Sequence, residues 1–305
     1  MYTSVQGIDL RLLHIFVTIA QCKGFSAAQA HLNMSQSAIS ASMAVLETRL
    51  GYRLCERGRR GFHLTEEGKR ILEFAQDLFS SLEHFVSRVR GLSGRLFGHL
   101  SIGLLDSTLT LKDAYIYQAI SRFYRRNQDV NIQLYIKSPT ELEQAIIDGQ
   151  IHAAISYTGR RVTNLQYVKL FSEKISIYCG RGHPLFRKPD VMVSDIRQAK
   201  WVKRGYLMPQ HLVPLVPDDD QMTAIAHQME GVALMILAGT HLGYLPQHYA
   251  KTWIDTGEMR VLNAKTLSYE AQHYLIFHRT RPHNEALEIF ISDILNEHLF
   301  HKDNI

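Results

Sequence analysis

The chain has 305 residues, 46% of them hydrophobic and 21% charged, with a formal net charge of +5. This length predicts two or three compact units, and the composition excludes a disordered or fibrous protein. Three cysteines without a CxxC pair indicate neither a disulfide framework nor a zinc site. The N-terminus lacks an uninterrupted apolar signal region, and no apolar run is long enough to cross a bilayer. We therefore expect a cytoplasmic protein without a membrane partner.

Most of the excess positive charge lies near the N-terminus. Residues 1–70 hold nine Lys and Arg against five Asp and Glu, whereas the other 235 residues hold 25 against 24. A local basic excess favours binding to a polyanion such as DNA, because neutralised phosphates release condensed counterions. A basic face that contacts only solvent is the alternative interpretation.

Three short helices are predicted in this basic segment. Asp9 is an N-cap residue followed by apolar residues at helical spacing. Ser26 and Gln29 form a capping-box pattern at the start of the second helix, and Ser35 caps the third, which ends at Gly51. Two short helices joined by a tight turn, after a supporting helix, form a helix-turn-helix. The predicted helices span residues 9–24, 26–33 and 35–51.

Polar side chains begin the third predicted helix. Its apolar residues Ile39, Met43 and Leu46 share one face, which leaves the polar residues on the others. A recognition helix presents its N-terminal end to base edges in the major groove, where glutamine pairs with adenine and serine reaches several bases. A solvated polar helix is the alternative interpretation. The residues concerned are Gln36, Ser37, Ser40 and Ala41.

Phosphate contacts must come from another segment, because this helix has no Lys or Arg before Arg49. Two short extended segments within residues 54–64 are joined by Gly58-Arg59-Arg60-Gly61, which predicts a hairpin wing with basic residues at its tip. The helix would then read bases while the wing anchors the phosphate backbone.

The segment LRLLHIFVTIAQCKGFSAAQAHLNMSQSAISASMAVLETRLGYRLCERGRRGFHLTEEG resembles the N-terminal domain of the LysR-type transcriptional regulators along its whole length. Cys55 stands where that family usually has phenylalanine. The resemblance implies a bacterial transcriptional regulator with a winged helix-turn-helix over residues 1–65 and double-stranded DNA as its partner. The DNA contacts that it implies are Ser26, Ser35, Gln36, Ser37, Ser40, Arg57, Arg59 and Arg60.

A long linker helix is predicted over residues 66–91. Thr65 caps it, and its apolar residues alternate steps of four and three, which predicts a coiled-coil seam. A second copy of the helix is the natural cover for this apolar surface, and packing against the first helix is the alternative. The family resemblance implies a homodimer that reads an interrupted palindrome, commonly a homotetramer, with RNA polymerase as a further partner. The seam residues are Ile71, Ala75, Leu78, Leu82, Phe85 and Val89.

Residues 92–98 mark a hinge, after which strand and helix patterns alternate. Period-two apolar stretches precede helical ones near residues 110–127 and 139–149, which predicts βαβ units, and residues 222–238 are predicted to be mostly helical. The family's effector domain resembles a type 2 periplasmic binding protein, so we expect an α/β fold of two subdomains with a ligand cleft between them. The predicted bounds are 99–305 for the domain, about 99–160 and 268–305 for the first subdomain, and about 161–267 for the second.

Candidate effector contacts lie where predicted strands end. The stretch Ser138-Pro139-Thr140-Glu141 is a capping box with proline at the first helical position. Hydroxyls and amides at helix starts favour an anionic group, although Asp106 would repel a carboxylate and the caps would otherwise serve only their helices. The aromatic residues favour a small aromatic or weakly acidic effector. The candidate residues are Ser107, Thr108, Ser138, Thr140, Tyr157, Arg204 and Tyr206.

Motifs of common enzymes are absent from the sequence: it has no GxSxG, no GxGxxG after a strand, no P-loop and no HExxH. We therefore predict no enzyme activity, no catalytic residue and no cofactor. His298 and His301 have a metal-binding spacing, but 16 histidines produce such a pair by chance, so we predict no metal site. The alternative function is a small-molecule-binding protein or enzyme whose N-terminal head serves only oligomerisation, and salt-dependent duplex binding separates the two.

Overall fold

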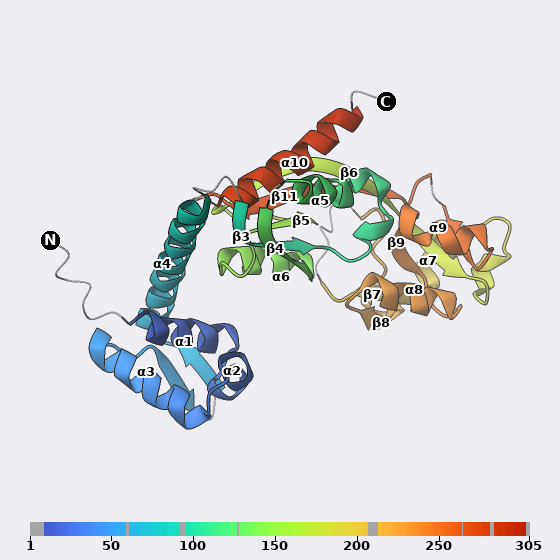
Figure 1. The fold of residues 1–305 in the computed structure, drawn as a ribbon. Coiled ribbons are helices and arrows are strands. Elements are labelled where there is room, and N and C mark those ends of the chain that lie inside the picture. Colours follow the sequence, from blue (N-terminus) through green and yellow to red (C-terminus); the bar gives the residue numbers. More distant parts are fainter. Residues whose placement is uncertain are drawn as a thin grey trace. The chain divides into compact units, whose positions relative to one another are not determined.

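The computed structural model describes residues 9–58, 61–91, 96–126, 128–206, 213–263, 265–280 and 284–302. The chain divides into two compact units, Met1–Val89 and Arg90–Ile305 (Figure 1). Within the described ranges, no helix is both long and apolar enough to cross a membrane.

The N-terminal unit begins with three short helices, as predicted. α1 (Leu10–Gln21) begins after Asp9, whose side chain accepts a hydrogen bond from the backbone of the first turn. α3 (Gln36–Leu50) begins after the capping Ser35 and ends at Gly51, which has a φ of 78°. Glycine adopts this left-handed conformation at the least cost, which explains why α3 ends there.

The second helix begins one residue earlier than predicted. α2 (Phe25–Leu32) follows Gly24 and has no side-chain cap, so the predicted capping box of Ser26 and Gln29 is wrong. Instead, Gln29 Nε2 donates to the Ser26 carbonyl oxygen at 3.4 Å. The hydrophobic core is the physical reason, because the first turn of α2 buries the Phe25 ring, which is only 5% exposed.

The core of the N-terminal unit joins the three helices to a two-stranded wing. β1 (Cys55–Gly58) pairs antiparallel with β2 (Gly61–Leu64), so the predicted hairpin is confirmed. The tip of this hairpin, Arg59 and Arg60, lies outside the described residues. Side chains with no exposed surface at the centre of the core are Phe16, Ile19, Ala28, Ile39 and Leu54.

α4 (Glu66–Gly91) is the predicted long helix. Thr65 caps it, since its Oγ1 accepts a hydrogen bond from the Gly68 amide at 2.9 Å. A side chain at Gly68 would overlap the backbone carbonyl of Leu54, so the close approach of helix and wing requires glycine here.

The apolar stripe of α4 has two different environments. Ala75 is 3% exposed and belongs to the core of the N-terminal unit, and Ile71 and Leu78 pack against the same core. Phe85 and Val89 are instead 64% and 50% exposed. Packing within the chain therefore accounts for the first half of the stripe and leaves the second half uncovered by the residues that the structure describes.

A seven-stranded mixed sheet runs through the C-terminal unit (Figure 1). Its strands are β3 (Leu96–Leu104), β4 (Gln128–Ile136), β5 (Ala153–Tyr157), β6 (Leu165–Gly180), β9 (Gly243–Pro246), β10 (Met259–Leu262) and β11 (Tyr269–His278). The strand order is β10-β6-β11-β5-β3-β4, and β9 pairs with β6. β3 runs parallel to β4 and β5, whereas β6 and β11 pair antiparallel.

The C-terminal unit has two lobes, which confirms the predicted α/β class with two subdomains. The first lobe surrounds β3, β4 and β5 with α5 (Ile116–Tyr124), α6 (Pro139–Ile147) and α10 (Glu285–Lys302). The second lobe contains a small sheet of β7 (Trp201–Arg204) and β8 (Met222–Ala226) with α7 (Val193–Gln198), α8 (Met229–Leu237) and α9 (Gln247–Asp255). The chain passes between the lobes along β6 and returns along β11.

Two predicted helical stretches are shorter than expected. Over the described residues 110–126, α5 is the only α-helix, and two single turns of 3-10 helix, Thr108–Thr110 and Lys112–Ala114, precede it. Residues 222–238 contain β8 before α8. β8 forms because it pairs in parallel with β7, and its side chains alternate between half-buried and exposed, a period-two pattern that the apolar helix beside it obscures.

Candidate nucleic-acid interface and ligand cleft

The first turn of α3 presents polar side chains to solvent. Ser35 Oγ accepts a hydrogen bond from the Ala38 amide at 3.3 Å and lies 3.0 Å from Ser37 Oγ. Ser35, Gln36 and Ser37 are exposed, and Ser40 is half-buried one turn later. The serine cap fixes the start of the helix, so Gln36 is the longest exposed side chain at the end that a recognition helix turns to base edges.

The other predicted DNA contacts are distributed over two further elements. Ser26 is exposed in the first turn of α2. Arg57 lies on β1 opposite Phe62, and its side chain is outside the described part of the chain, as are Arg59 and Arg60. The structure therefore brings together the four predicted residues at the start of α3 and leaves the wing tip undescribed.

A cleft in the C-terminal unit has two adjoining compartments. The aromatic compartment has a volume of about 600 Å³ and is lined by four predicted residues, Ser138, Thr140, Arg204 and Tyr206. The polar compartment, of about 440 Å³, is lined by Asp106 and shares Ser138 and Tyr206 with the first. The apolar wall of the aromatic compartment includes Trp201, Leu215, Met222, Ile225, Tyr244 and Tyr269.

Arg204 is a buried cation in the wall of the aromatic compartment and is 8% exposed. Its Nη1 donates to the hydroxyl oxygens of Tyr157 at 3.2 Å and Tyr206 at 3.5 Å, and its Nη2 donates to the Tyr244 carbonyl at 3.4 Å. Burial disfavours the charged guanidinium, but its electrostatic interactions with Tyr206, Tyr157, Tyr269 and Glu173 together outweigh burial and raise the pKa of Arg204. The cleft therefore has a fixed positive charge on its wall.

Ser107 and Thr108 do not line either compartment. Thr108 Oγ1 donates to the Leu105 carbonyl at 3.0 Å, which closes the turn after β3. Asp106 reaches the cleft instead and accepts a hydrogen bond from the Met229 amide at the start of α8. Burial raises the pKa of Asp106, although this hydrogen bond opposes the effect. A carboxylate of the chain thus occupies the start of a helix that would otherwise attract an anion.

The predicted capping box at the start of α6 is confirmed. Glu141 Oε2 accepts hydrogen bonds from Ser138 Oγ at 2.6 Å and from the Ser138 amide at 2.9 Å. These bonds lower the pKa of Glu141. The Ser138 hydroxyl therefore serves the helix cap while it lies on the wall that both compartments share.

The sequence did not predict the aromatic wall of the cleft. Trp201, Tyr244 and Tyr269 come from β7, β9 and β11, three strands that are far apart along the chain. Their rings meet because Tyr244 contacts both others, with ring centroids 5.5 Å apart in each pair. The sequence shows only that an aromatic residue lies at or near the end of each strand. It does not reveal that these strands are neighbours, so it could not predict that the three rings form one wall.

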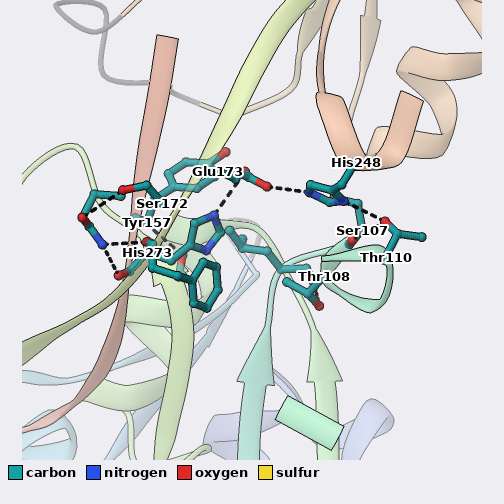
Figure 2. Close-up of polar contacts among 12 residues, drawn as sticks. Ser107, Thr108, Thr110, Tyr157, Ser172, Glu173, His248 and His273 are labelled. Atoms are coloured by element: carbon teal, nitrogen blue, oxygen red, sulfur yellow. Dashed lines mark hydrogen bonds and ion pairs between the residues drawn. The ribbon is translucent and has the colours of Figure 1, made fainter. Parts of the chain in front are cut away.

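A buried carboxylate with two histidines was also missed (Figure 2). Glu173 on β6 has one carboxylate oxygen 2.9 Å from His248 Nε2 and the other 3.1 Å from His273 Nε2. Burial by itself would raise the pKa of Glu173, but the two histidines lower it to about 2. Glu173 is therefore ionised, and these three residues belong to no motif because they come from β6, α9 and β11.

His298, one of the two histidines with a metal-binding spacing, packs against other residues of the chain. His298 Nε2 lies 3.1 Å from the Ala114 carbonyl oxygen, and its ring stacks on Phe171. The side chain of His301 is outside the described residues. Among the described residues, no group of three or more metal-ligating side chains is present.

Two family models match the chain: "Bacterial regulatory helix-turn-helix protein, lysR family" over residues 10–69, and "LysR substrate binding domain" over residues 93–298. The HTH-type transcriptional activator BauR of Pseudomonas aeruginosa is 36% identical over 292 residues, which cover 95% of each chain. The crystal structure of a full-length AphB variant covers 94% of this chain and 98% of its own, with a TM-score of 0.66 at 16% identity.

The crystal structure of CbnR, a LysR family transcriptional regulator, covers 95% of this chain and 99% of its own, with a TM-score of 0.62 at 17% identity. The homologues are transcriptional regulators and not enzymes. Both the fold and the sequence thus agree across the helix-turn-helix and the two-lobed unit. The chain belongs to the LysR family of bacterial transcriptional regulators, with a helix-turn-helix DNA-binding domain and an effector-binding domain.

Proposed function

We propose that the winged helix-turn-helix reads an interrupted palindromic promoter site in double-stranded DNA. The observation that carries this proposal is the exposed polar start of α3, where Gln36 stands beside the capping Ser35. Glutamine pairs with adenine in the major groove, and serine hydroxyls bond to phosphates or bases. Arg57, Arg59 and Arg60 supply phosphate contacts from the wing, so reading and anchoring are divided between two elements.

Selection of bound duplexes from randomised DNA tests this proposal. The intact protein enriches an interrupted palindrome, because a symmetric dimer reads two half-sites. Gln36→Ala relaxes the preference at particular positions, whereas the double change Arg59→Ala and Arg60→Ala weakens binding to all sequences and reduces its salt dependence. Thr48→Ala, exposed near the other end of α3, is the matched control. If no duplex is enriched, the head serves only oligomerisation.

We infer that the aromatic compartment binds a small aromatic or weakly acidic effector. Trp201 and Tyr244 supply a surface for an aromatic ring, and Arg204 supplies a fixed positive charge. Asp106 and Glu141 lie in the polar compartment, where their negative charges repel an acidic group. The acidic end of the effector is therefore expected beside Arg204.

Binding of benzoate and benzamide distinguishes the role of charge from that of the ring. Trp201 lines the compartment, so its fluorescence reports on both probes. We expect benzoate to bind about tenfold more tightly than benzamide, the size of one charge-assisted hydrogen bond, and Arg204→Gln to remove this difference. Lys200→Gln, at an exposed lysine that lines neither compartment, is the control and preserves it. Equal binding of both probes to the unaltered protein would overturn the acidic class of effector.

We further propose that the protein is a homodimer through the second half of α4, assembled as a homotetramer that contacts RNA polymerase. The proposed domain bounds are 1–65, 66–91 for the linker, 92–98 for the hinge and 99–305. Effector binding changes the closure of the cleft and with it the spacing of the DNA-binding domains, because coupling requires two states with different effector affinity. DNA contacts that stay the same whatever occupies the cleft would contradict this coupling.

A further inference from the structure

A chain of polar contacts joins three elements of the C-terminal unit (Figure 2). Glu173 on β6 accepts from His248 Nε2 on α9 at 2.9 Å, and His248 Nδ1 lies 2.8 Å from Thr110 Oγ1 in the turn after β3. The same Thr110 hydroxyl donates to the Ser107 carbonyl at 3.1 Å. We call Glu173, His248, Thr110 and the Ser107 carbonyl the polar latch.

The polar latch extends from the interior to the surface. The Glu173 side chain is 5% exposed and that of His248 is 16% exposed, whereas Thr110 is exposed. His273 covers the second oxygen of Glu173 and stacks on Phe171, with ring centroids 4.7 Å apart. A carboxylate in this position is shielded from water, so its interaction with an imidazole is strong, and stronger when that imidazole is charged.

The donors and acceptors of the latch determine which protonation state of His248 satisfies all of its hydrogen bonds. His248 Nε2 faces a carboxylate oxygen that only accepts, so it carries a proton. The Thr110 hydroxyl has one proton, and the Ser107 carbonyl can only accept it. All contacts are therefore satisfied together when His248 Nδ1 also carries a proton and donates to Thr110. Neutral His248 accepts from Thr110, and the Ser107 carbonyl then loses the hydroxyl donor and keeps only the Thr110 amide, at 3.4 Å.

The latch lies across the boundary between the lobes. Thr110 and Ser107 belong to the first lobe, and His248 belongs to α9 of the second. Glu173 lies on β6, one of the two strands between the lobes, opposite Ala271 on β11, which has a register irregularity at Gln272–Tyr274. The hydrogen bond from the Met229 amide to Asp106 is a second tie between the same lobes. Rotation of one lobe away from the other would break both ties.

We propose that this latch is a pH-sensitive tie between the two lobes, in which protonation of His248 completes the contacts and favours the closed cleft. Loss of the second ring proton removes the donor to Thr110, so closure weakens as pH rises. The tie requires no effector, so it goes beyond the proposed function. The titratable or charged groups around it are Glu173, His273, Asp106, Arg204, Glu230, and Tyr249 and Lys251 on α9 itself.

Hydrogen exchange of the full-length protein without effector tests the proposal, measured at pH 6 and pH 8 and corrected for the intrinsic rates. Thr110→Val keeps the shape of the side chain and removes its hydroxyl. At pH 6 we expect this change to raise exchange about tenfold in both residues 105–115 and 245–256, because one charge-assisted hydrogen bond is lost. At pH 8 we expect a much smaller increase. Thr108→Val is the matched control, since its hydroxyl bonds only within its own turn.

A second variant tests the titration itself. His248→Gln retains a donor for Glu173 and an acceptor for Thr110 but carries no titratable proton. We expect exchange in residues 105–115 and 245–256 of this variant to lose its pH dependence. Equal effects of Thr110→Val at the two pH values, or faster exchange in only one of the two segments, would overturn the latch. Neither outcome bears on DNA reading or on the choice between benzoate and benzamide.

Discussion

The N-terminal unit and the ligand cleft differ in how their functional residues are distributed along the chain. Ser35, Gln36 and Ser37 are consecutive residues at the start of one helix. The cleft instead combines Asp106 after β3 with Arg204 on β7 and residues of other strand ends. A surface on one helix is determined by local periodicity, whereas a cleft is determined by strand order. The first is therefore visible in the sequence and the second is not.

The largest effect that separates the two regions is expected from Phe16→Ala. Phe16 has no exposed surface in the core of the N-terminal unit, so the loss is about 3–5 kcal/mol of that unit's stability. DNA binding disappears and circular dichroism shows an early unfolding transition. Both tryptophans, Trp201 and Trp253, lie in the C-terminal unit, so the transition seen by tryptophan fluorescence stays in place. Val45→Ala, at an exposed position, is the control. A matching shift in fluorescence would show that the units do not fold independently.

A smaller effect, confined to the C-terminal unit, is expected at acid pH from His152. Its Nδ1 accepts from the Ser101 amide at 2.9 Å, and burial together with His99 lowers its pKa to about 4. The unfolded chain binds this proton near pH 6.5, so the unfolded state gains protons first as pH falls, and stability is lost between about pH 6.5 and 4.

Through His152, the free energy of unfolding is expected to fall by about 2 kcal/mol between pH 7 and pH 5. His152→Asn keeps an acceptor for the Ser101 amide and removes the titration, so it abolishes this part of the acid sensitivity. Urea unfolding followed by tryptophan fluorescence at pH 7 and pH 5 measures this change in the free energy of unfolding. An unchanged pH dependence in the variant would assign the acid sensitivity to other groups.

The second half of α4 offers a test of assembly that leaves both cores intact. Phe85 is 64% exposed, so Phe85→Glu removes apolar surface without opening the N-terminal core. We expect dimerisation to weaken about tenfold or more, since the charge prevents burial of that surface in a partner helix. Sedimentation over a range of concentrations measures this. Glu73→Lys, at an exposed position on the opposite side of the predicted seam, leaves the dimer unchanged. The same self-association in both variants would exclude this face as the dimer contact.

The smallest effects are expected at the two serine caps, one in each region. Ser35→Ala and Ser138→Ala each cost about 1 kcal/mol of stability, because each serine caps a helix. Ser35→Gly preserves most of the cap, so weaker DNA binding by this variant, with unchanged thermal stability, identifies a direct contact of the hydroxyl with DNA. Restored DNA binding in Ser35→Gly would instead assign only the capping role to Ser35.

Local signals in the sequence were sufficient for most elements. Asp9, Ser35 and Thr65 cap the helices that they were predicted to cap, and the wing forms around Gly58 and Gly61. These features depend on a few neighbouring residues, so one stretch of sequence contains the information. The errors arose where tertiary burial prevails over local pattern, as where the first turn of α2 buries Phe25 and where pairing with β7 makes β8 a strand.

The sequence by itself determined the family, the helix-turn-helix and the polar start of α3, because each follows from residues at helical or capping spacing. Tertiary structure alone decided that Arg204 lies against Tyr157 and Tyr206, that the first half of α4 is buried and its second half exposed, and that Glu173 meets His248 and Thr110. The physical reason is that contacts between distant segments depend on strand order and on the packing of whole helices. Neither leaves a local periodicity in the chain.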